Sequence, residues 1–303
     1  MIIYATVFVK RHYCKIASFY VFALQRITAN HYYCVSYHFC TATNSCKMLF
    51  HKYSKTFRKN SMQFQEIMEA LAGYGTEQNR KIYRRHGAKG DMFGVSFAHQ
   101  GQLVKAIKKA KLPADELRKL AEELWQTKNV DARTLSAMID PPALHSPESL
   151  TRRLYDCDYF YLADSIAKIA RSTPYAEQVL KEWIAKSDEL FLRAAYTLLG
   201  VMALESPDLS DEFFAPHIKT ITEKIHTAPN RAKEGMNNCL IAIGGRNEAL
   251  RDLVFEAADI IGPVEIDHGE TSCQTFLIKP YIEKMYARQA LKPKGKKRTP
   301  LGC

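Results

Sequence analysis

Apolar residues recur every three or four positions along the chain from about Met62 onward, a spacing typical of amphipathic helices. The clearest case follows Pro113, where the apolar positions are Leu117, Leu120, Ala121, Leu124 and Trp125. Similar patterns predict helices near residues 77–86, 102–111 and 130–139, while the one β-like run, residues 264–266, is too short to matter. We therefore predict an almost entirely helical body of about ten or eleven helices.

Proline residues mark the helix starts expected in the second half of this body. They occur in the dipeptides Ser146-Pro147, Thr173-Pro174, Ser206-Pro207 and Ala228-Pro229. Proline is tolerated in a first helical turn because its missing N–H would have no partner there, and a preceding Ser or Thr can cap the helix. Successive helices of about 12–17 residues with short loops predict an all-α, HEAT/armadillo-like solenoid of paired antiparallel helices. A compact helical bundle is the alternative architecture.

Composition divides the chain into three parts. Residues 1–61 contain nine Lys and Arg but no Asp or Glu, and they are rich in Tyr, Phe, His and Cys. We interpret them as a poorly ordered, basic segment of non-native sequence upstream of a true start at Met48 or Met62. Residues 62–290 are the predicted HEAT-like repeat domain, and residues 291–303 are a predicted basic, disordered tail.

The formal net charge of +11 belongs to the two ends of the chain. Residues 291–303 hold five basic residues and no acidic one, which leaves 29 basic and 32 acidic residues for positions 62–290. The basic pI therefore gives only weak support for a nucleic-acid partner of the body. A helical solenoid can still line one groove with Lys and Arg while its back is acidic.

Cysteine spacing and missing motifs exclude several classes of protein. The eight cysteines include no CxxC pair, which argues against zinc ribbons and thioredoxin-like proteins and favours reduced thiols in a cytoplasmic protein. The longest apolar run of the N-terminal segment, residues 16–24, is shorter than the ~20 residues of a membrane span. Phosphate-binding glycine loops, HExxH and GxSxG are absent, so we predict no cofactor, no metal and no membrane association.

Two blocks carry candidate chemistry. Phe160 and Asp164 are four residues apart and share a helix face, with Lys168 one turn further. A ring and a carboxylate on one face can bind a cationic ligand, whereas the simpler interpretation is a surface ion pair between Asp164 and Lys168. In the second block, Arg193 can contact a phosphate or lie on the surface as an ordinary arginine, and Trp183 is expected in the core.

Taken together, these blocks resemble the DNA alkylation repair family, the AlkD-type alkylpurine DNA glycosylases, over residues 66–288. The resemblance rests on the order and spacing of five groups of residues. They are Tyr83-Arg84-Arg85-His86-Gly87 with Gly94-Val95; Ala163-Asp164-Ser165; Trp183-Ile184 through Arg193-Ala194-Ala195; Ala228-Pro229-Asn230-Arg231 with Met236-Asn237; and Val264-Glu265-Ile266-Asp267 with Thr271-Ser272-Cys273. The resemblance implies a HEAT-like superhelix with DNA in a concave, basic groove.

The resemblance also implies roles for individual residues. Asp164 matches the catalytic carboxylate of the family, and Arg193 matches an arginine that contacts the DNA backbone. Two tryptophans beside the damaged nucleotide are expected, but Phe160 replaces one, and the other falls near Asn237–Cys239, which offers no ring. The predicted substrate- and DNA-binding residues are Phe160, Lys168, Arg193, Asn237 and Asn238. This pattern resembles a longer-tailed branch of the family.

The implied activity is excision of positively charged N3- or N7-alkylated purines from double-stranded DNA by a monomer. Such a base is already a good leaving group, so one carboxylate that stabilises the oxocarbenium-like sugar would suffice. Phe is a weaker cation–π partner than Trp, which predicts reduced activity. The alternatives are a catalytically weak or inactive helical-repeat DNA-binding module and a protein-interaction scaffold.

Overall fold

In the computed structural model, the described residues are 20–28, 31–38 and 64–291, and the chain divides into two compact units, residues 1–60 and 61–303. The first unit contains a hairpin of two antiparallel strands, β1 (Tyr20–Thr28) and β2 (His31–His38), with Tyr20 opposite His38. This hairpin was not predicted from the sequence, although aromatic and β-branched residues, which favour strands, are frequent in both segments. The remaining predictions for residues 1–61 and for the tail fall on residues 1–19, 29–30, 39–61 and 292–303, outside the described residues.

The second unit is built from thirteen α-helices and one 3₁₀ turn within residues 64–291, and no strand lies in that range. The helices are α2 (Phe64–Tyr74), α3 (Glu77–Arg85), α4 (Phe97–Lys109), α5 (Ala114–Gln126), α6 (Val130–Ile139), α7 (Pro147–Tyr155), α8 (Phe160–Arg171), α9 (Ala176–Ile184), α10 (Glu189–Glu205), α11 (Asp211–Lys224), α12 (Asn230–Gly244), α13 (Glu248–Ile261) and α14 (Ile278–Ala290), with the 3₁₀ turn η1 at Pro142–Leu144. No helix of this unit is long and apolar enough to cross a membrane.

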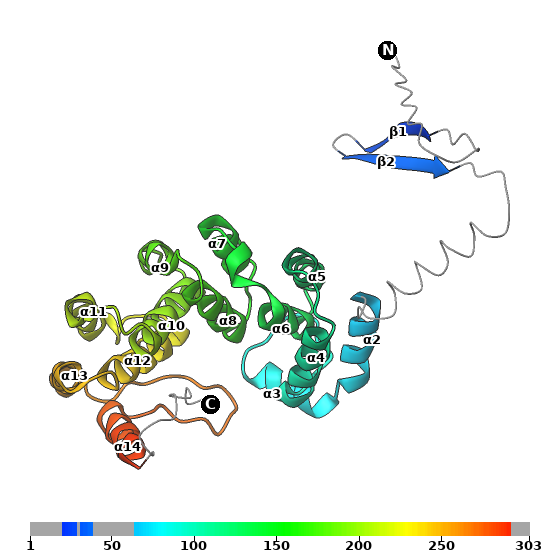
Figure 1. Cartoon of the computed structure of the whole chain (residues 1–303). Helices are drawn as coiled ribbons and strands as arrows, with labels where there is room; N and C mark the ends of the chain where they lie inside the picture. The colour runs from blue at the N-terminus through cyan, green and yellow to red at the C-terminus, as the bar shows by residue number, and fades with distance from the viewer. Residues whose placement is uncertain (1–19, 29–30, 39–63, 292–303) are drawn as a thin grey trace. The chain divides into compact units, whose positions relative to one another are not determined.

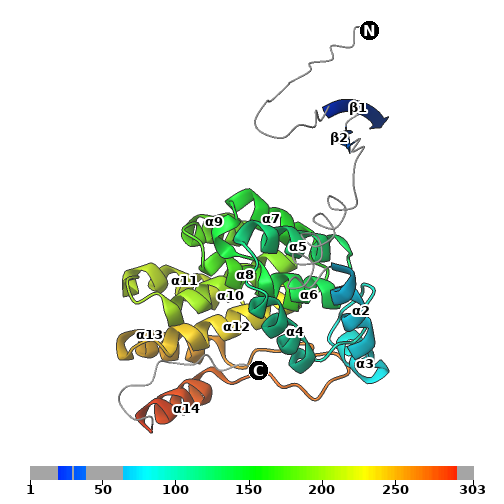
Figure 2. The same ribbon diagram turned by 45° about the vertical axis from the view of Figure 1, so that its right-hand side comes forward.

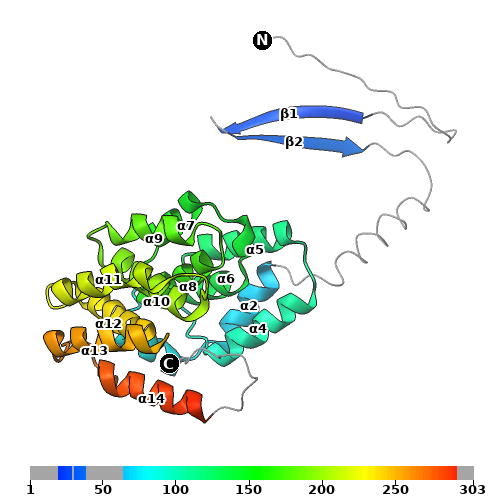
Figure 3. The same ribbon diagram turned by 60° about the vertical axis from the view of Figure 1, so that its left-hand side comes forward.

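Most of these helices form two stacked rows. The helices α5, α7, α9, α11 and α13 make an outer row, and α4, α6, α8, α10 and α12 make an inner row on the inside of the arc (Figure 1). Consecutive helices pair across the rows, as in α5 with α6 and α9 with α10, and α14 packs on α12 and α13 at the C-terminal end (Figure 3). The prediction of an all-α, HEAT-like solenoid is confirmed.

Both tryptophans of the chain lie in the core rather than at a surface site. Trp125 is 1% exposed and Trp183 is fully buried, as expected for Trp183 from its helix position. The indole N–H of Trp183 donates to Thr151 Oγ1 at 2.9 Å, and that of Trp125 donates to Asp156 Oδ2 at 3.1 Å. Each buried indole thus keeps a hydrogen-bond partner while its rings fill the space between the two rows.

A buried carboxylate fixes the loop that precedes α4. Asp131, at the start of α6, accepts hydrogen bonds from the backbone N–H groups of Phe93, Gly94 and Val95 at 2.7–2.9 Å. Gly94 has φ +79°, and a Cβ there would lie 2.4 Å from the carbonyl oxygen of Thr76, so the loop requires glycine at this position. These contacts hold Phe97, the first residue of α4, in a defined place.

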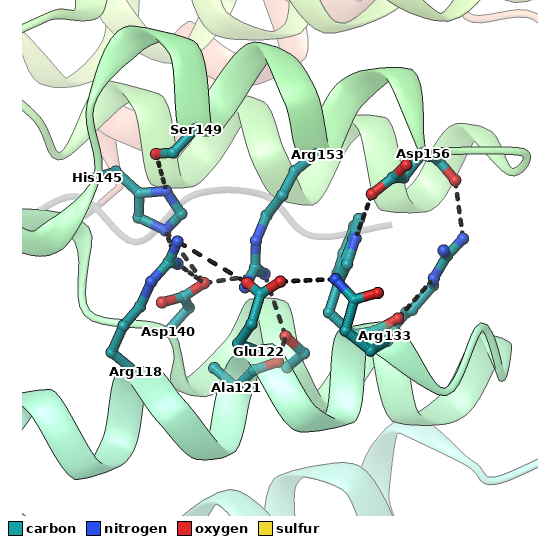
Figure 4. Close-up of polar contacts among 12 residues, drawn as sticks. Arg118, Ala121, Glu122, Arg133, Asp140, His145, Ser149, Arg153 and Asp156 are labelled. Atoms are coloured by element: carbon teal, nitrogen blue, oxygen red, sulfur yellow. Dashed lines mark hydrogen bonds and ion pairs between the residues drawn. The ribbon is translucent and has the colours of Figure 1, made fainter. Parts of the chain in front are cut away.

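A buried ionic network ties α5, α6 and α7 together (Figure 4). The carboxylate of Asp140, just after α6, has a fully buried side chain. Its Oδ2 lies 2.6 Å from Arg118 Nη1, 2.9 Å from Arg153 Nη1 and 3.1 Å from His145 Nε2. Arg153 also pairs with Glu122 at 3.0 Å. Because its charges are paired inside the protein, this network serves the fold, and its side chains come from α5, from α7 and from the segment after α6.

The long connection between α13 and α14, residues 262–277, crosses the unit from α12 to α3 (Figures 1 and 2). At the α12 end, Asn230 and Asp267 exchange two hydrogen bonds of 2.7 Å, and Asn237 Nδ2 donates to the carbonyl oxygen of Phe276 at 2.9 Å. At the α3 end, Gly269 lies close to the backbone of Arg85. A Cβ added at Gly269 would be 2.9 Å from the carbonyl oxygen of Arg85. The connection therefore links α3, near the start of the unit, to α12, near its end.

Candidate functional site

The exposed stripe of α8 faces the inside of the arc. Its apolar residues are buried against α6, α7, α9 and α10, so the remaining polar and half-buried positions form the free side of an inner helix. These positions are Phe160, Tyr161, Asp164, Ser165 and Lys168. The sequence-predicted carboxylate Asp164 is thus on the inner face, with 15% of its side chain exposed.

Asp164 is held by α10. Arg193 Nε donates to Asp164 Oδ1 and Arg193 Nη2 donates to Asp164 Oδ2, both at 2.8 Å, which is the bidentate arrangement of a strong Arg–carboxylate pair. Thr197, one turn after Arg193, donates its hydroxyl proton to Asp164 Oδ1 at 2.8 Å. The carboxylate therefore has both oxygens engaged inside the protein.

Arg193 also forms an ion pair with a residue of α12. Its Nη1 donates to Glu234 Oε2 at 2.6 Å, and Arg231 pairs with the same oxygen at 3.0 Å. Burial alone would raise the pKa of Glu234, but the charges and hydrogen bonds of Arg193 and Arg231 outweigh it and lower that pKa. Burial would lower the pKa of Arg193, but Asp164 and Glu234 raise it further above its usual range. The group combines two carboxylates with two guanidinium groups, so its formal charges cancel.

Phe160 is covered by these arginines. The guanidinium carbon of Arg193 lies 4.8 Å from the centre of the Phe160 ring, and that of Arg231 lies 4.5 Å from it. Both distances are within cation–π range. The ring of Tyr159 packs edgewise on the ring of Phe160, with 4.9 Å between ring centres. The aromatic ring predicted to attract a cationic base thus already has two cationic partners from the protein.

The rim of this site is built by α3 and the 262–277 connection. His86, at the end of α3, lies within electrostatic range of Arg231, Glu234 and His268, and burial followed by the Arg231 charge lowers the pKa of His86. A polar hollow of about 600 Å³ lies next to it, between the start of α12 and the connection. Its lining includes Asn230, Lys233, Glu265, Asp267, His268 and Gln274. No group of three His, Cys, Asp or Glu side chains in the described part of the chain is placed to hold a metal ion.

The other predicted residues lie in different surroundings. Lys168 is exposed on the α8 stripe, and among the described residues no ion pair joins it to Asp164. Asn237 is 2% exposed and holds the 262–277 connection through Phe276, while Asn238 is half-buried on α12. Arg193 is 5% exposed, so the ordinary surface-arginine interpretation does not describe it. Its contact with a phosphate, and the DNA contacts of Lys168, Asn237 and Asn238, stay predictions.

Sequence reasoning missed three members of the site: Thr197, Glu234 and, as a pairing residue, Arg231. Two of them could have been found from their spacing in the sequence. Thr197 is one turn from Arg193 and Glu234 is three residues from Arg231, and residues at these spacings are neighbours on a helix. The Asp164–Arg193 pair had no such signal, since its members come from different helices 29 residues apart. Neither tryptophan reaches the site, because both are in the core.

A family model described as DNA alkylation repair enzyme matches residues 67–258, well over half of the chain. The chain belongs to the DNA alkylation repair enzyme family. The match ends inside α13, and it contains the whole Asp164–Arg193–Glu234 group of the site. The resemblance inferred from the sequence is therefore confirmed.

Two proteins with similar sequences are the uncharacterized proteins Lin0241 of Listeria innocua serovar 6a and Lmo0209 of Listeria monocytogenes serovar 1/2a. Each is 24% identical to it over 225 residues, which covers 73% of this chain and 96% of the relative. A solved structure is also similar, with a TM-score of 0.69, 27% identity, and coverage of 80% of this chain and all of the other. It is described as a new family of proteins related to the HEAT-like repeat DNA glycosylases with affinity for branched DNA structures.

Proposed function

We propose that this protein is a DNA-binding member of the alkylation repair family that holds DNA on the inner face of its helical rows without excising alkylated bases. The observation that carries the proposal is the closed Asp164–Arg193–Glu234–Arg231 group, in which two carboxylates are paired with two guanidinium groups. A formally neutral, mutually hydrogen-bonded group supports the fold of the inner face more readily than it supports a cationic transition state.

The electrostatics of the site oppose excision of a cationic base. Stabilising an oxocarbenium-like sugar requires a preorganised charge that is free to act on the sugar. Both oxygens of Asp164 are instead bound by Arg193, and Thr197 adds a third hydrogen bond. A base that carries a positive charge would also meet the guanidinium groups of Arg193 and Arg231 at Phe160. Like charges at that ring would repel the substrate, so the site lacks both attractions that the glycosylase mechanism needs.

Excision of N3- or N7-alkylated purines is the second candidate function. It is favoured by the position of Asp164 on the inner face, where DNA would lie, and by the partial exposure of its side chain. For this function Arg193 would have to leave Asp164 when DNA binds. Base release that depends on Asp164 is therefore the property that separates the two candidates.

Exposed lysines on the inner row supply the proposed phosphate contacts. On α4, Lys105 and Lys108 follow Phe97 by eight and eleven residues, which keeps them near the same helix face, and Lys168 lies on the free stripe of α8. All three are exposed. The similar solved structure is described as having affinity for branched DNA, and we extend that preference to this chain as part of the proposal.

Replacing the three inner lysines tests DNA binding. We expect Lys105→Ala/Lys108→Ala/Lys168→Ala to weaken binding to duplex and branched DNA alike and to flatten the salt dependence by roughly three counterions, because each lost phosphate contact removes about one released ion. Fluorescence anisotropy over a range of salt concentrations measures both. The matched control, Lys181→Ala/Lys219→Ala/Lys224→Ala, removes exposed lysines of the outer helices α9 and α11. Equal losses in both triple variants would contradict binding on the inner face.

A further inference from the structure

We propose that Phe97 and Tyr161 form a stacking platform for an unpaired DNA base on the inner face, so that the protein prefers DNA with locally unpaired nucleotides. This inference rests on the proposed function, and it identifies the class of DNA that the inner face takes. It concerns residues outside the Asp164 group, which have no role in the chemistry considered above.

Five aromatic side chains form a connected row from α3 to α8. The ring centres are 6.2 Å apart for Tyr83 and Phe97, 4.8 Å for Phe97 and Tyr161, 6.3 Å for Tyr161 and Tyr159, and 4.9 Å for Tyr159 and Phe160. Aromatic pairs at these distances support one another. The rings therefore contact one another in sequence from α3 to α8, and the row ends at the two arginines that cover Phe160.

Phe97 is the most exposed member of this row, and Tyr161 beside it is half-buried. The side chain of Phe97 is 48% exposed, whereas Tyr159 is 7% exposed and forms part of the core. The ring is not loose, because Ser96 caps α4 and Asp131 holds the preceding loop, and its tilted contact with Tyr161 orients it further. A large apolar ring that is fixed in place and open to water is suited to bind a flat ligand.

Charge identifies that ligand as a nucleotide. Lys105 and Lys108 lie about 12 and 16 Å along α4 from Phe97, and Lys168 lies about 10 Å along α8 from Tyr161. Aromatic rings together with lysines are the combination that binds single-stranded nucleic acid, since bases stack on the rings and phosphates pair with the lysines. A purely apolar partner would gain nothing from the lysines, and an acidic peptide would gain nothing from the ring pair.

The same geometry distinguishes unpaired from paired DNA. In a duplex each base is stacked on its neighbours, and reaching a protein ring would require unstacking at a cost of a few kcal/mol. At a gap, a flap or a branch point the base is already free. Phe97 and Tyr161 should therefore add affinity for such DNA and add nothing for a continuous duplex.

A comparison of gapped and continuous duplexes of the same sequence tests the platform. We expect the parent protein to bind a duplex with a three-nucleotide gap more tightly than the continuous duplex. Phe97→Ala should lose about 5- to 140-fold in affinity for the gapped DNA, the range for one stacked base, while its affinity for the continuous duplex stays the same. Phe97→Trp should keep the preference. Tyr175→Ala, which removes a ring that is 36% exposed at the start of the outer helix α9, is the control for loss of an exposed aromatic residue.

The outcomes separate this inference from the proposed function. Equal affinity of the parent for gapped and continuous DNA, or an unchanged preference in Phe97→Ala, overturns the stacking platform while DNA binding through the inner lysines stands. Binding of neither DNA by the parent protein removes the proposed function and the platform with it. A circular dichroism melt of Phe97→Ala that matches the parent shows that any loss of affinity is not a loss of folding.

Discussion

Replacing Asp140 by Asn is expected to lower the free energy of unfolding by about 3–5 kcal/mol, the usual cost of removing one partner from a buried charge pair. The Asp140 side chain is fully buried, and it is the shared partner of Arg118 and Arg153, whose Nη1 atoms lie 2.6 and 2.9 Å from Oδ2. Without the carboxylate, Arg153, with 1% of its side chain exposed, keeps only Glu122 as an ionic partner. Denaturant unfolding followed by circular dichroism measures the loss.

The loss should depend on pH in a defined direction. Burial would raise the pKa of Asp140, but the hydrogen bond with His145 and the charge of Arg153 outweigh it and hold that pKa below its usual value. A carboxylate with a lowered pKa stabilises the fold fully above the unfolded value of about 3.9, and this contribution disappears as pH falls through the lower folded value. The stability difference between parent and Asp140→Asn should thus shrink as pH falls below about 4.

Glu122→Gln is the matched control for this network. Glu122 pairs with the same Arg153 at 3.0 Å, but 34% of its side chain is exposed, so solvent screens the pair and its loss should cost about 1 kcal/mol or less. An Asp140→Asn variant no less stable than Glu122→Gln would show that the network does not stabilise the fold as described.

Replacing Arg193 by Met is expected to lower the free energy of unfolding by a similar amount, about 3–5 kcal/mol. The substitution removes the partner of Asp164 and one of the two partners of Glu234, whose side chains are only 15% and 19% exposed. Asp164 would keep the hydroxyl of Thr197 alone. Chemical denaturation of the variant measures the loss. The free energy of unfolding of Arg193→Lys should fall between those of the parent and Arg193→Met, because Lys keeps the charge but not the bidentate contact.

A double-mutant cycle isolates the Asp164–Arg193 contact. Because Asp164→Asn removes the charge that Arg193→Met leaves unpaired, the double variant should be more stable than the sum of the two single losses predicts, by about 0.5–3 kcal/mol. Strict additivity would mean that the two side chains do not interact in solution. Arg193 would then be free to contact phosphate, as the family resemblance implies.

The sequence predicted the fold better than the helix boundaries. Proline correctly marked the starts of α7 and α12, since Pro147 is the first residue of α7 with Ser146 as its cap, and Pro229 directly precedes α12. Pro174 and Pro207 instead lie in turns two and four residues before α9 and α11. Thr173 uses its hydroxyl within that turn, where it accepts from the N–H of Tyr175, rather than as a helix cap. Local signals therefore locate a chain reversal more reliably than the first helical residue.

Phe160, Asp164 and Arg193 were singled out from the sequence, but the contacts among them were not. Asp164 and Phe160 were found because they share one helix face. Asp164 pairs with Arg193 on the adjacent helix, however, and not with Lys168, the partner that the simpler interpretation gave it. A guanidinium that makes two hydrogen bonds in a nearly buried position outcompetes an exposed ammonium group that is held only by its own helix. Which inner helices are neighbours is decided by packing of the whole solenoid, and no pattern within one helix contains that information.

Base release from methylated DNA distinguishes DNA binding without excision from glycosylase activity. A duplex with a single 7-methylguanine is incubated with the protein at a concentration at which anisotropy shows the DNA to be bound, and free base is measured by chromatography against a protein-free control. We expect bound DNA with release no faster than in the control, for the parent and for Asp164→Asn alike. Release by the parent that exceeds the control and disappears in Asp164→Asn would contradict it and assign the excision activity to Asp164.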